Sequence, residues 1–254
     1  MIFLLFFALA CQQTHYPNST TTNKAPENWK NLLLKAVQGD KVDYDLLIKN
    51  RDVLEQYMTW IATHGPLSNR YSIREEKRKI CYYANAYNAA VVYGVLQHWP
   101  ITSVKEVDSG WFTGQNVGFF LGQQFVVDGD ATTLFHLEHD LILGQFQDPR
   151  LHAMLNCASK GCPPLRYWET TDLDQKLDQQ WGDFIQKSTK KHKTGWSISE
   201  MFFWYQNDIL DWSHASNLCI YVSPYLKGDA QKWMRKHSQD CPISSFPYDW
   251  SLND

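Results

Sequence analysis

The chain contains little that would suit a membrane-spanning or nucleic-acid-binding protein. The apolar run at residues 2–10 is far shorter than the roughly 20 residues that a membrane helix needs. The 24 basic and 27 acidic residues give a formal net charge of −3. A chain with no strong positive field has no electrostatic hold on nucleic acid, so we exclude that class of partner. No sequence repeat is visible, and we expect no cofactor.

The composition that is present indicates a folded domain rich in aromatic side chains. Hydrophobic residues make up 44% of the 254 and charged residues 20%, which excludes a largely disordered chain. Aromatic residues make up 15% and include 11 Trp, which suits a large aromatic core or an aromatic-lined cleft. The last residues, 243–254, are rich in aromatic side chains, so we expect them to dock on the body of the domain as a last strand. We place one full-size domain at residues 26–254. Helical spacing alternates with short strand-like segments, so we predict an α+β fold.

The first residues resemble a bacterial lipoprotein signal. The apolar run ends in Ala8-Leu9-Ala10-Cys11, which has the form of a lipobox, although no Lys or Arg precedes the run. Residues 12–25 are polar and rich in Thr and Asn, as a tether between membrane and domain would be. We therefore predict a signal peptide at residues 1–11 and lipid attachment at Cys11. The protein would then be anchored in the cell envelope, on the periplasmic side of a bacterial membrane.

Lipid on Cys11 leaves an odd number of cysteines in the domain. In an oxidising compartment at least one thiol then stays unpaired within the chain. The sequence does not determine how the others pair. The five are Cys81, Cys157, Cys162, Cys219 and Cys241.

Residues 72–99 have the pattern of a long helix with two amides on its apolar face. At 100° per residue, Asn85 and Asn88 lie in the middle of the face that carries the Ala and Val side chains. Buried carboxamides need hydrogen-bond partners. They are either struts that tie loops to the core or groups that orient a catalytic side chain, and the strut interpretation is the more common one.

Glu138 and His139 lie on a second predicted helix. Residues 117–130 have strand character on either side of Gly122-Gln123 and a turn at residues 128–130, so we predict a hairpin there. Asp130 or Thr132 can then cap a helix over residues 133–143. Glu138 falls on the apolar face of that helix and His139 at its edge. A carboxylate there needs a partner. We expect Glu138 either to anchor Arg150 or Arg166, or to orient an imidazole.

Residues 148–166 hold the densest group of reactive side chains. Residues 151–155 predict a short buried strand, and the small polar loop that follows carries Cys157 and Cys162. A thiol at the end of a buried strand is a plausible nucleophile. The alternative is a structural disulfide between these two cysteines.

Five motifs together resemble the domain of unknown function 547 family, in that family's order and over roughly residues 71–253. They are residues 84–88, the pair Glu138-His139, and residues 148–152, 157–166 and 248–253. The resemblance implies a single mixed helix-and-sheet domain of the kind found in bacterial exported proteins and in some multidomain eukaryotic ones. It also implies a thiol site like those of papain or transglutaminase enzymes.

The first functional hypothesis is therefore a cysteine nucleophile that acts by acyl transfer or hydrolysis of an amide or thioester. Cys157 would attack, and His139 or His152 would be its base. We prefer His139, because on a strand an offset of five residues puts His152 and Cys157 on opposite faces. Glu138 would be the third catalytic residue, and the supporting residues would be Asn85, Asn88, His152 and Arg150.

Two alternatives remain open. One is a non-catalytic envelope module that binds a peptide, a glycan or a small molecule, with Cys157 and Cys162 joined as a structural disulfide. The other, less favoured, is a zinc site, because His139, His152, Cys157 and Cys162 are donor types that zinc accepts. The spacing of these cysteines is looser than that of a typical zinc motif, and we predict no metal.

Overall fold

The computed structural model describes residues 13–15, 20–68, 75–107 and 117–254, and Cys11 and its lipobox lie outside them. The helices are α1 (Ala25–Ala36), α2 (Tyr44–Lys49), α3 (Arg51–Thr63), α4 (Glu76–His98), α5 (Val117–Phe120), α6 (Leu134–His136), the π-helical turn η2 (Leu137–Leu143), α7 (Gly144–Phe146), α8 (Leu173–Lys187), α9 (Met201–Trp204), α10 (Gln206–Ser213), α11 (Leu218–Val222) and α12 (Gly228–Lys236). Three 3₁₀ turns are η1 (Val104–Glu106), η3 (Pro149–Ala153) and η4 (Ser223–Tyr225). The strands are β1 (Gln13–His15), β2 (Val37–Gln38), β3 (Lys41–Val42), β4 (Gln123–Val127), β5 (Asp130–Thr133), β6 (Thr189–His192), β7 (Gly195–Ser199) and β8 (Ser244–Phe246).

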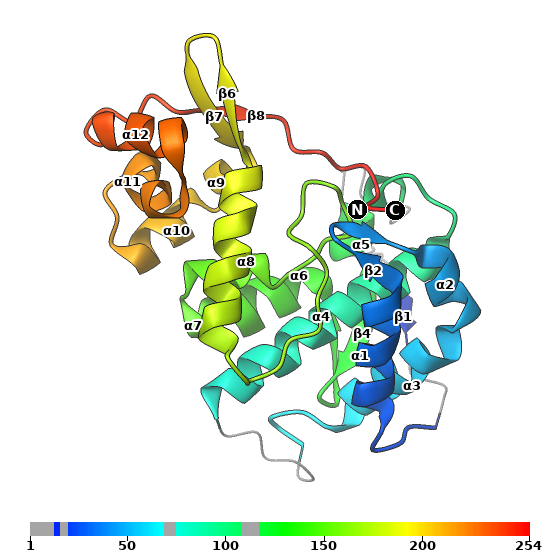
Figure 1. Cartoon of the computed structure of the whole chain (residues 1–254). Coiled ribbons are helices and arrows are strands. Elements are labelled where there is room, and N and C mark those ends of the chain that lie inside the picture. Colours follow the sequence, from blue (N-terminus) through cyan, green and yellow to red (C-terminus); the bar gives the residue numbers. More distant parts are fainter. Residues whose placement is uncertain (1–12, 16–19, 69–74, 108–116) are drawn as a thin grey trace, which may run out of the picture.

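The predicted mixture of helices and sheets is confirmed, with the helices dominant (Figure 1). In Figure 1, α1 to α4 lie on one side of the molecule and α10 to α12 on the other, with α8 between them. The strands of the described residues form three small sheets, in the orders β1-β4-β5, β2-β3 and β6-β7-β8. In the first, β4 pairs antiparallel with β5 and places Phe125 opposite Thr132. No described helix is long and apolar enough to cross a membrane.

Helix α4 is the centre of the larger hydrophobic core. Nearly all of its residues from Ile80 to Leu96 are buried, as expected of a helix that has packing partners on every side. Helix α3 packs against it, and α1 packs on α3 in turn. In α1 the buried residues Trp29, Leu32 and Leu33 recur at helical spacing on the face toward α3.

The helix predicted over residues 133–143 is present but irregular. The Thr133 hydroxyl accepts a hydrogen bond from the backbone N–H of His136, so Thr133 is the cap rather than Asp130 or Thr132. The middle of the segment is the π-helical turn η2, in which the backbone N–H of Gly144 donates to the carbonyl of His139 five residues earlier. A side chain at Gly144 would contact that carbonyl, which explains why glycine suits the wide turn. π-Helical turns are rare and often occur at functional sites.

Two predicted strands are wrong. Residues 151–155 lie partly in the 3₁₀ turn η3, because Pro149 occupies its first position and the Asp148 side chain accepts from the backbone N–H of Arg150. The argument that placed His152 and Cys157 on opposite faces of a strand therefore does not apply, because His152 lies in this turn. The predicted hairpin is present as β4 and β5, but residues 117–120 before it form the helical turn α5.

The C-terminal segment crosses the molecule and docks on it, as its aromatic sequence predicts. Strand β8 pairs parallel with β7, and the chain then runs across to the α1–α4 side (Figure 1). There the backbone N–H of Val42 donates to Asn253, and Leu252 forms a bridge with Ser159. The last residues thus lie against the loop that carries Cys157.

Candidate functional site

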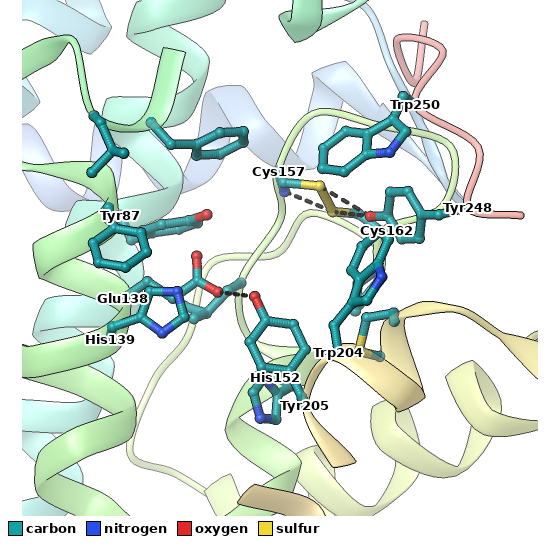
Figure 2. Close-up of a pocket in the computed structure, with 16 residues that line it drawn as sticks. Tyr87, Glu138, His139, His152, Cys157, Cys162, Trp204, Tyr205, Tyr248 and Trp250 are labelled. Atoms are coloured by element: carbon teal, nitrogen blue, oxygen red, sulfur yellow. Dashed lines mark hydrogen bonds between the residues drawn. A yellow bond between two sulfur atoms is a disulfide. The ribbon is translucent and has the colours of Figure 1, made fainter. Parts of the chain in front are cut away.

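A cavity of about 410 Å³ opens between the π-helical turn, the Cys157 loop, helix α9 and the C-terminal segment (Figure 2). This volume is within the range of small-molecule sites. Seven of the sixteen lining residues are Phe, Tyr or Trp. The lining residues in the described part of the chain are Tyr87, Phe120, Leu121, Phe135, Glu138, His139, His152, Leu155, Cys157, Cys162, Pro163, Met201, Trp204, Tyr205, Tyr248 and Trp250.

Glu138 is half-buried on one side of the cavity and is held by tyrosines rather than by an arginine. The Tyr205 hydroxyl donates to its Oε1 at 2.7 Å, and the ring of Tyr87 lies beside it in Figure 2. Burial and then the Glu138 carboxylate raise the pKa values of Tyr87 and Tyr205, so both phenols stay protonated. The predicted anchor to Arg150 or Arg166 is wrong, because among the described residues no Lys, Arg or His forms an ion pair with Glu138.

Arg150 lies outside the cavity. Its guanidinium hydrogen-bonds the carboxylates of Asp148 and Asp178 and contacts that of Asp174. Hydrogen bonds to Asp148 are the main reason why the pKa of Arg150 is raised. Arg150 therefore links η3 to α8 and does not line the cavity.

The two histidines reach the cavity from different elements, and neither is paired with a sulfur atom. The His139 ring packs 4.2 Å from that of Phe135, measured between ring centres. The His152 ring packs 4.2 Å from that of Tyr205. Burial, and then His139, lower the pKa of His152 to about 3, so its imidazole is neutral. Its Nε2 lies 4.0 Å from Asp208, beyond hydrogen-bond distance.

Cys157 and Cys162 form a disulfide in the cavity wall, one of the two outcomes left open by the sequence. The Tyr248 hydroxyl lies 3.1 Å from the Cys157 sulfur and 3.0 Å from the Cys162 sulfur. The Ser159 hydroxyl is also 3.1 Å from Cys157 and donates to Tyr248. The groups closest to the bridge are thus hydroxyls.

The other three described cysteines form one more disulfide and leave one free thiol, as the odd number of cysteines in the domain requires. Cys219 and Cys241 form a second disulfide, and Cys81 is unpaired and buried. Burial raises the pKa of the Cys81 thiol to about 12, so it is unreactive at neutral pH.

The two buried amides of α4 act as struts. Asn88 Nδ2 donates to the carbonyl of Met154, and its Oδ1 accepts from the backbone N–H of Asn156, both at 2.9 Å. Asn85 forms the same double contact with the backbone of Trp168. These bonds fix the segment that carries Cys157 to the central helix. Neither amide contacts an imidazole in the described hydrogen bonds.

The donors proposed for zinc are not arranged as a metal site. Two of the four are sulfur atoms of a disulfide, which cannot act as thiolate ligands. Among the described residues no group of three or more His, Cys, Asp or Glu side chains is placed to hold a metal ion.

With this geometry in view, the comparison with protein families is informative. Residues 72–185 match the family model described as "Protein of unknown function, DUF547". The resemblance to this family is thereby confirmed over these residues. No curated protein and no solved structure matches the chain.

The DUF547 match covers only one side of the cavity. Glu138, His139 and both cysteines of the wall lie within residues 72–185. The facing rings of Trp204, Tyr248 and Trp250, and the ring of Tyr205 beside Glu138, come from residues after the match ends. The cavity is thus completed by the C-terminal part of the chain.

Sequence reasoning missed these facing aromatic residues as site residues. Tyr87 lies inside the motif at residues 84–88, and Tyr248 and Trp250 lie inside the motif at residues 248–253, so the motifs contained the signal. Trp204 and Tyr205 lie in a segment that reads as ordinary core. Their placement at the cavity follows only from the tertiary fold.

Proposed function

We propose that the protein is a binding module whose aromatic cavity takes a small ligand, with Cys157–Cys162 as a structural bridge in the wall. The observation that carries this proposal is the disulfide itself, since the sulfur that would be the nucleophile is bonded to Cys162. The cavity also has the size and the apolar lining of ligand sites. Its rim includes exposed apolar side chains of Leu121, Phe135 and Trp204, which a ligand would cover.

A ligand screen by thermal shift tests this proposal, with tryptophan fluorescence as the second readout. We expect bound compounds to raise the melting temperature of the native protein and of Phe203→Ala, but not of Trp204→Ala. Phe203 is the matched control, because it is exposed on the same helix but does not line the cavity. Equal stabilisation of the native protein and Trp204→Ala would place binding elsewhere and contradict the proposal.

Acyl transfer or hydrolysis by Cys157 is a second candidate, and one observation favours it. Cys157 is only partly buried and lies in the cavity wall, so reduction of the bridge exposes a thiol to any bound ligand. The test is iodoacetamide labelling of Cys157 across a pH series, with and without reductant, in the native protein and in His139→Ala. A thiolate that reacts well below pH 8.5 after reduction, and loses this reactivity in His139→Ala, would support the enzyme.

We also propose that the protein is exported and anchored by lipid on Cys11. Two disulfides support export, because cytosolic thiols are kept reduced in most organisms. In a bacterial host we expect the native protein to fractionate with membranes and Cys11→Ser to be released. Cys81→Ser is the control, and membrane association of Cys11→Ser would contradict the anchor.

A further inference from the structure

We infer that the cavity recognises a small organic cation, an ammonium group carried on a short apolar body. This inference rests on the proposed binding function and names the ligand class for the same site. Three features support it: the sign of the charge in the cavity, the way Glu138 is held, and the rings that face it.

The charge in the cavity is negative. Glu138 is the only Asp, Glu, Lys or Arg among the sixteen lining residues. His152 adds no positive charge, because its pKa is lowered to about 3. An anionic ligand would therefore meet a carboxylate with no Lys or Arg among the described lining residues to offset it, whereas a cation would gain the electrostatic attraction.

Glu138 is held in place without being neutralised. The Tyr205 hydroxyl donates to one carboxylate oxygen at 2.7 Å, and Tyr87 lies beside the group. Phenol donors orient a carboxylate but leave its charge in place. A half-buried carboxylate that has no ion-pair partner among the described residues is costly unless a cation binds beside it.

The opposite wall is an aromatic surface. Trp204, Tyr248 and Trp250 form a cluster in which the Trp204 and Trp250 rings stack with their centres 5.8 Å apart. In Figure 2 these three residues and Glu138 lie on opposite sides of the cavity. Aromatic faces attract cations, and aromatic cages bind ammonium groups in this way. Lys105 already places its Nζ 4.7 Å from the centre of the Trp250 ring, so a ring of this cluster accepts a cation in the protein itself.

The polar groups of the cavity are too few to favour a neutral sugar. Besides Glu138 and the two histidines, the lining offers mainly tyrosine hydroxyls, and that of Tyr248 is engaged by Ser159 and the disulfide. A ligand with many hydroxyls would leave several of them without partners in an apolar cavity. A compact cation with an apolar body leaves none.

The experiment compares matched cationic and neutral ligands by isothermal titration calorimetry. The first pair is choline and 3,3-dimethyl-1-butanol, which have nearly the same shape but differ by the charge. The second pair is benzylamine and benzyl alcohol, with benzoate as the anionic probe. The titrations are made at pH 8, where histidine side chains are ordinarily neutral. We expect each cation to bind about tenfold or more tightly than its neutral partner and benzoate to bind least.

Variants then assign the effect to Glu138. We expect Glu138→Gln to weaken choline and benzylamine about tenfold and to leave the alcohols nearly unchanged. Asp140→Asn is the matched control, because Asp140 lies on the same π-helical turn, pairs with His136 and does not line the cavity. Circular dichroism and thermal melting establish that each variant is folded.

Each outcome decides the inference. If the alcohols bind as tightly as the cations, or if Glu138→Gln leaves choline binding unchanged, the cation inference is wrong while the binding function stands. If none of the five probes binds and the thermal-shift screen also finds no ligand that depends on Trp204, both fail. If only benzoate binds, the charge argument is reversed and the cation class is excluded.

Discussion

At the scale of single residues, Asn88 holds the wall of the cavity in place although it does not line the cavity itself. Replacing Asn88 with Ala leaves the Asn156 N–H without its buried partner, and leaves the Met154 carbonyl with only the hydrogen bond from Trp168 Nε1. We expect Asn88→Ala to lower the free energy of unfolding by about 1–3 kcal/mol, measured by urea denaturation. Asn28→Ala, on the exposed face of α1, is the control and should change stability by less than about 0.5 kcal/mol. A small effect at Asn88 would mean that water replaces the strut.

His152 makes stability depend on pH in a defined direction. Its pKa is about 3 in the folded protein and about 6.5 in the unfolded chain. Between these values the unfolded chain binds a proton that the folded protein does not, so stability is full above pH 6.5 and falls as the pH is lowered. We expect a slope of about 1.4 kcal/mol per pH unit from this one group.

The measurement for His152 is urea denaturation at pH values from 7 to 4. Carboxylates also titrate in this range, so the quantity to compare is the difference between the native protein and His152→Phe. Phe suits the site because the ring packs among Tyr205, Trp181 and Trp212. The free energy of unfolding of the native protein, relative to that of His152→Phe, should fall steadily as the pH is lowered. Parallel curves for the two proteins would show that His152 is not buried as a neutral ring.

At the scale of elements, the Cys157–Cys162 loop and the C-terminal segment fit together with no spare space. A Cβ on Gly161 would lie 2.7 Å from the ring of Tyr248, which lines the cavity. We therefore expect Gly161→Ala to displace Tyr248, to lower the melting temperature by several degrees and to weaken ligand binding.

Gly182→Ala is the matched control for Gly161→Ala. Gly182 lies inside α8, where an added Cβ would be 3.4 Å from Tyr225, an ordinary contact. Because Ala favours a helix more than Gly does, this variant should be neutral or more stable by up to about 1 kcal/mol. Equal losses at both positions would contradict the close fit to Tyr248. Differential scanning calorimetry reports both effects.

The elements also show what sequence can predict. The long helix, its two buried amides, the turn at Asp128-Gly129 and the docked C-terminal segment follow from periodicity and turn chemistry, and the structure confirms them. Residues 151–155 were predicted wrongly, because a run of apolar residues fits a strand and a buried 3₁₀ turn equally well. There the Asp-Pro pair at the start was the better signal. The hydrogen-bond partner of Glu138 could not be predicted from the sequence pattern, because Tyr205 lies 67 residues away in sequence.

At the scale of the whole molecule, the cavity lies where distant parts of the chain meet. Its Glu138 side belongs to the DUF547 match, and the opposite aromatic side comes from α9 and the C-terminal segment. Two hydrophobic clusters support these two sides, one around α4 and one around α8 and α11. A fragment limited to residues 72–185 would therefore lack five of the sixteen described lining residues, four of them aromatic.

The two disulfides affect this assembly differently, and a pair of double variants separates their roles. Cys219–Cys241 spans 22 residues of sequence inside the second cluster, whereas Cys157–Cys162 spans 5 and lines the cavity. From loop-closure entropy we expect Cys219→Ala with Cys241→Ala to cost about 3 kcal/mol of stability in urea denaturation. Cys157→Ala with Cys162→Ala should cost about 2 kcal/mol.

Ligand binding should rank these two double variants in the opposite order. The variant without Cys157 and Cys162 loses the covalent link that holds the cavity wall, so calorimetry should show weaker binding despite its smaller loss of stability. The variant without Cys219 and Cys241 should bind normally under conditions in which it is folded, because neither residue lines the cavity. Normal binding after removal of Cys157 and Cys162 would instead mean that the wall is held by the Asn88 strut and the C-terminal segment alone.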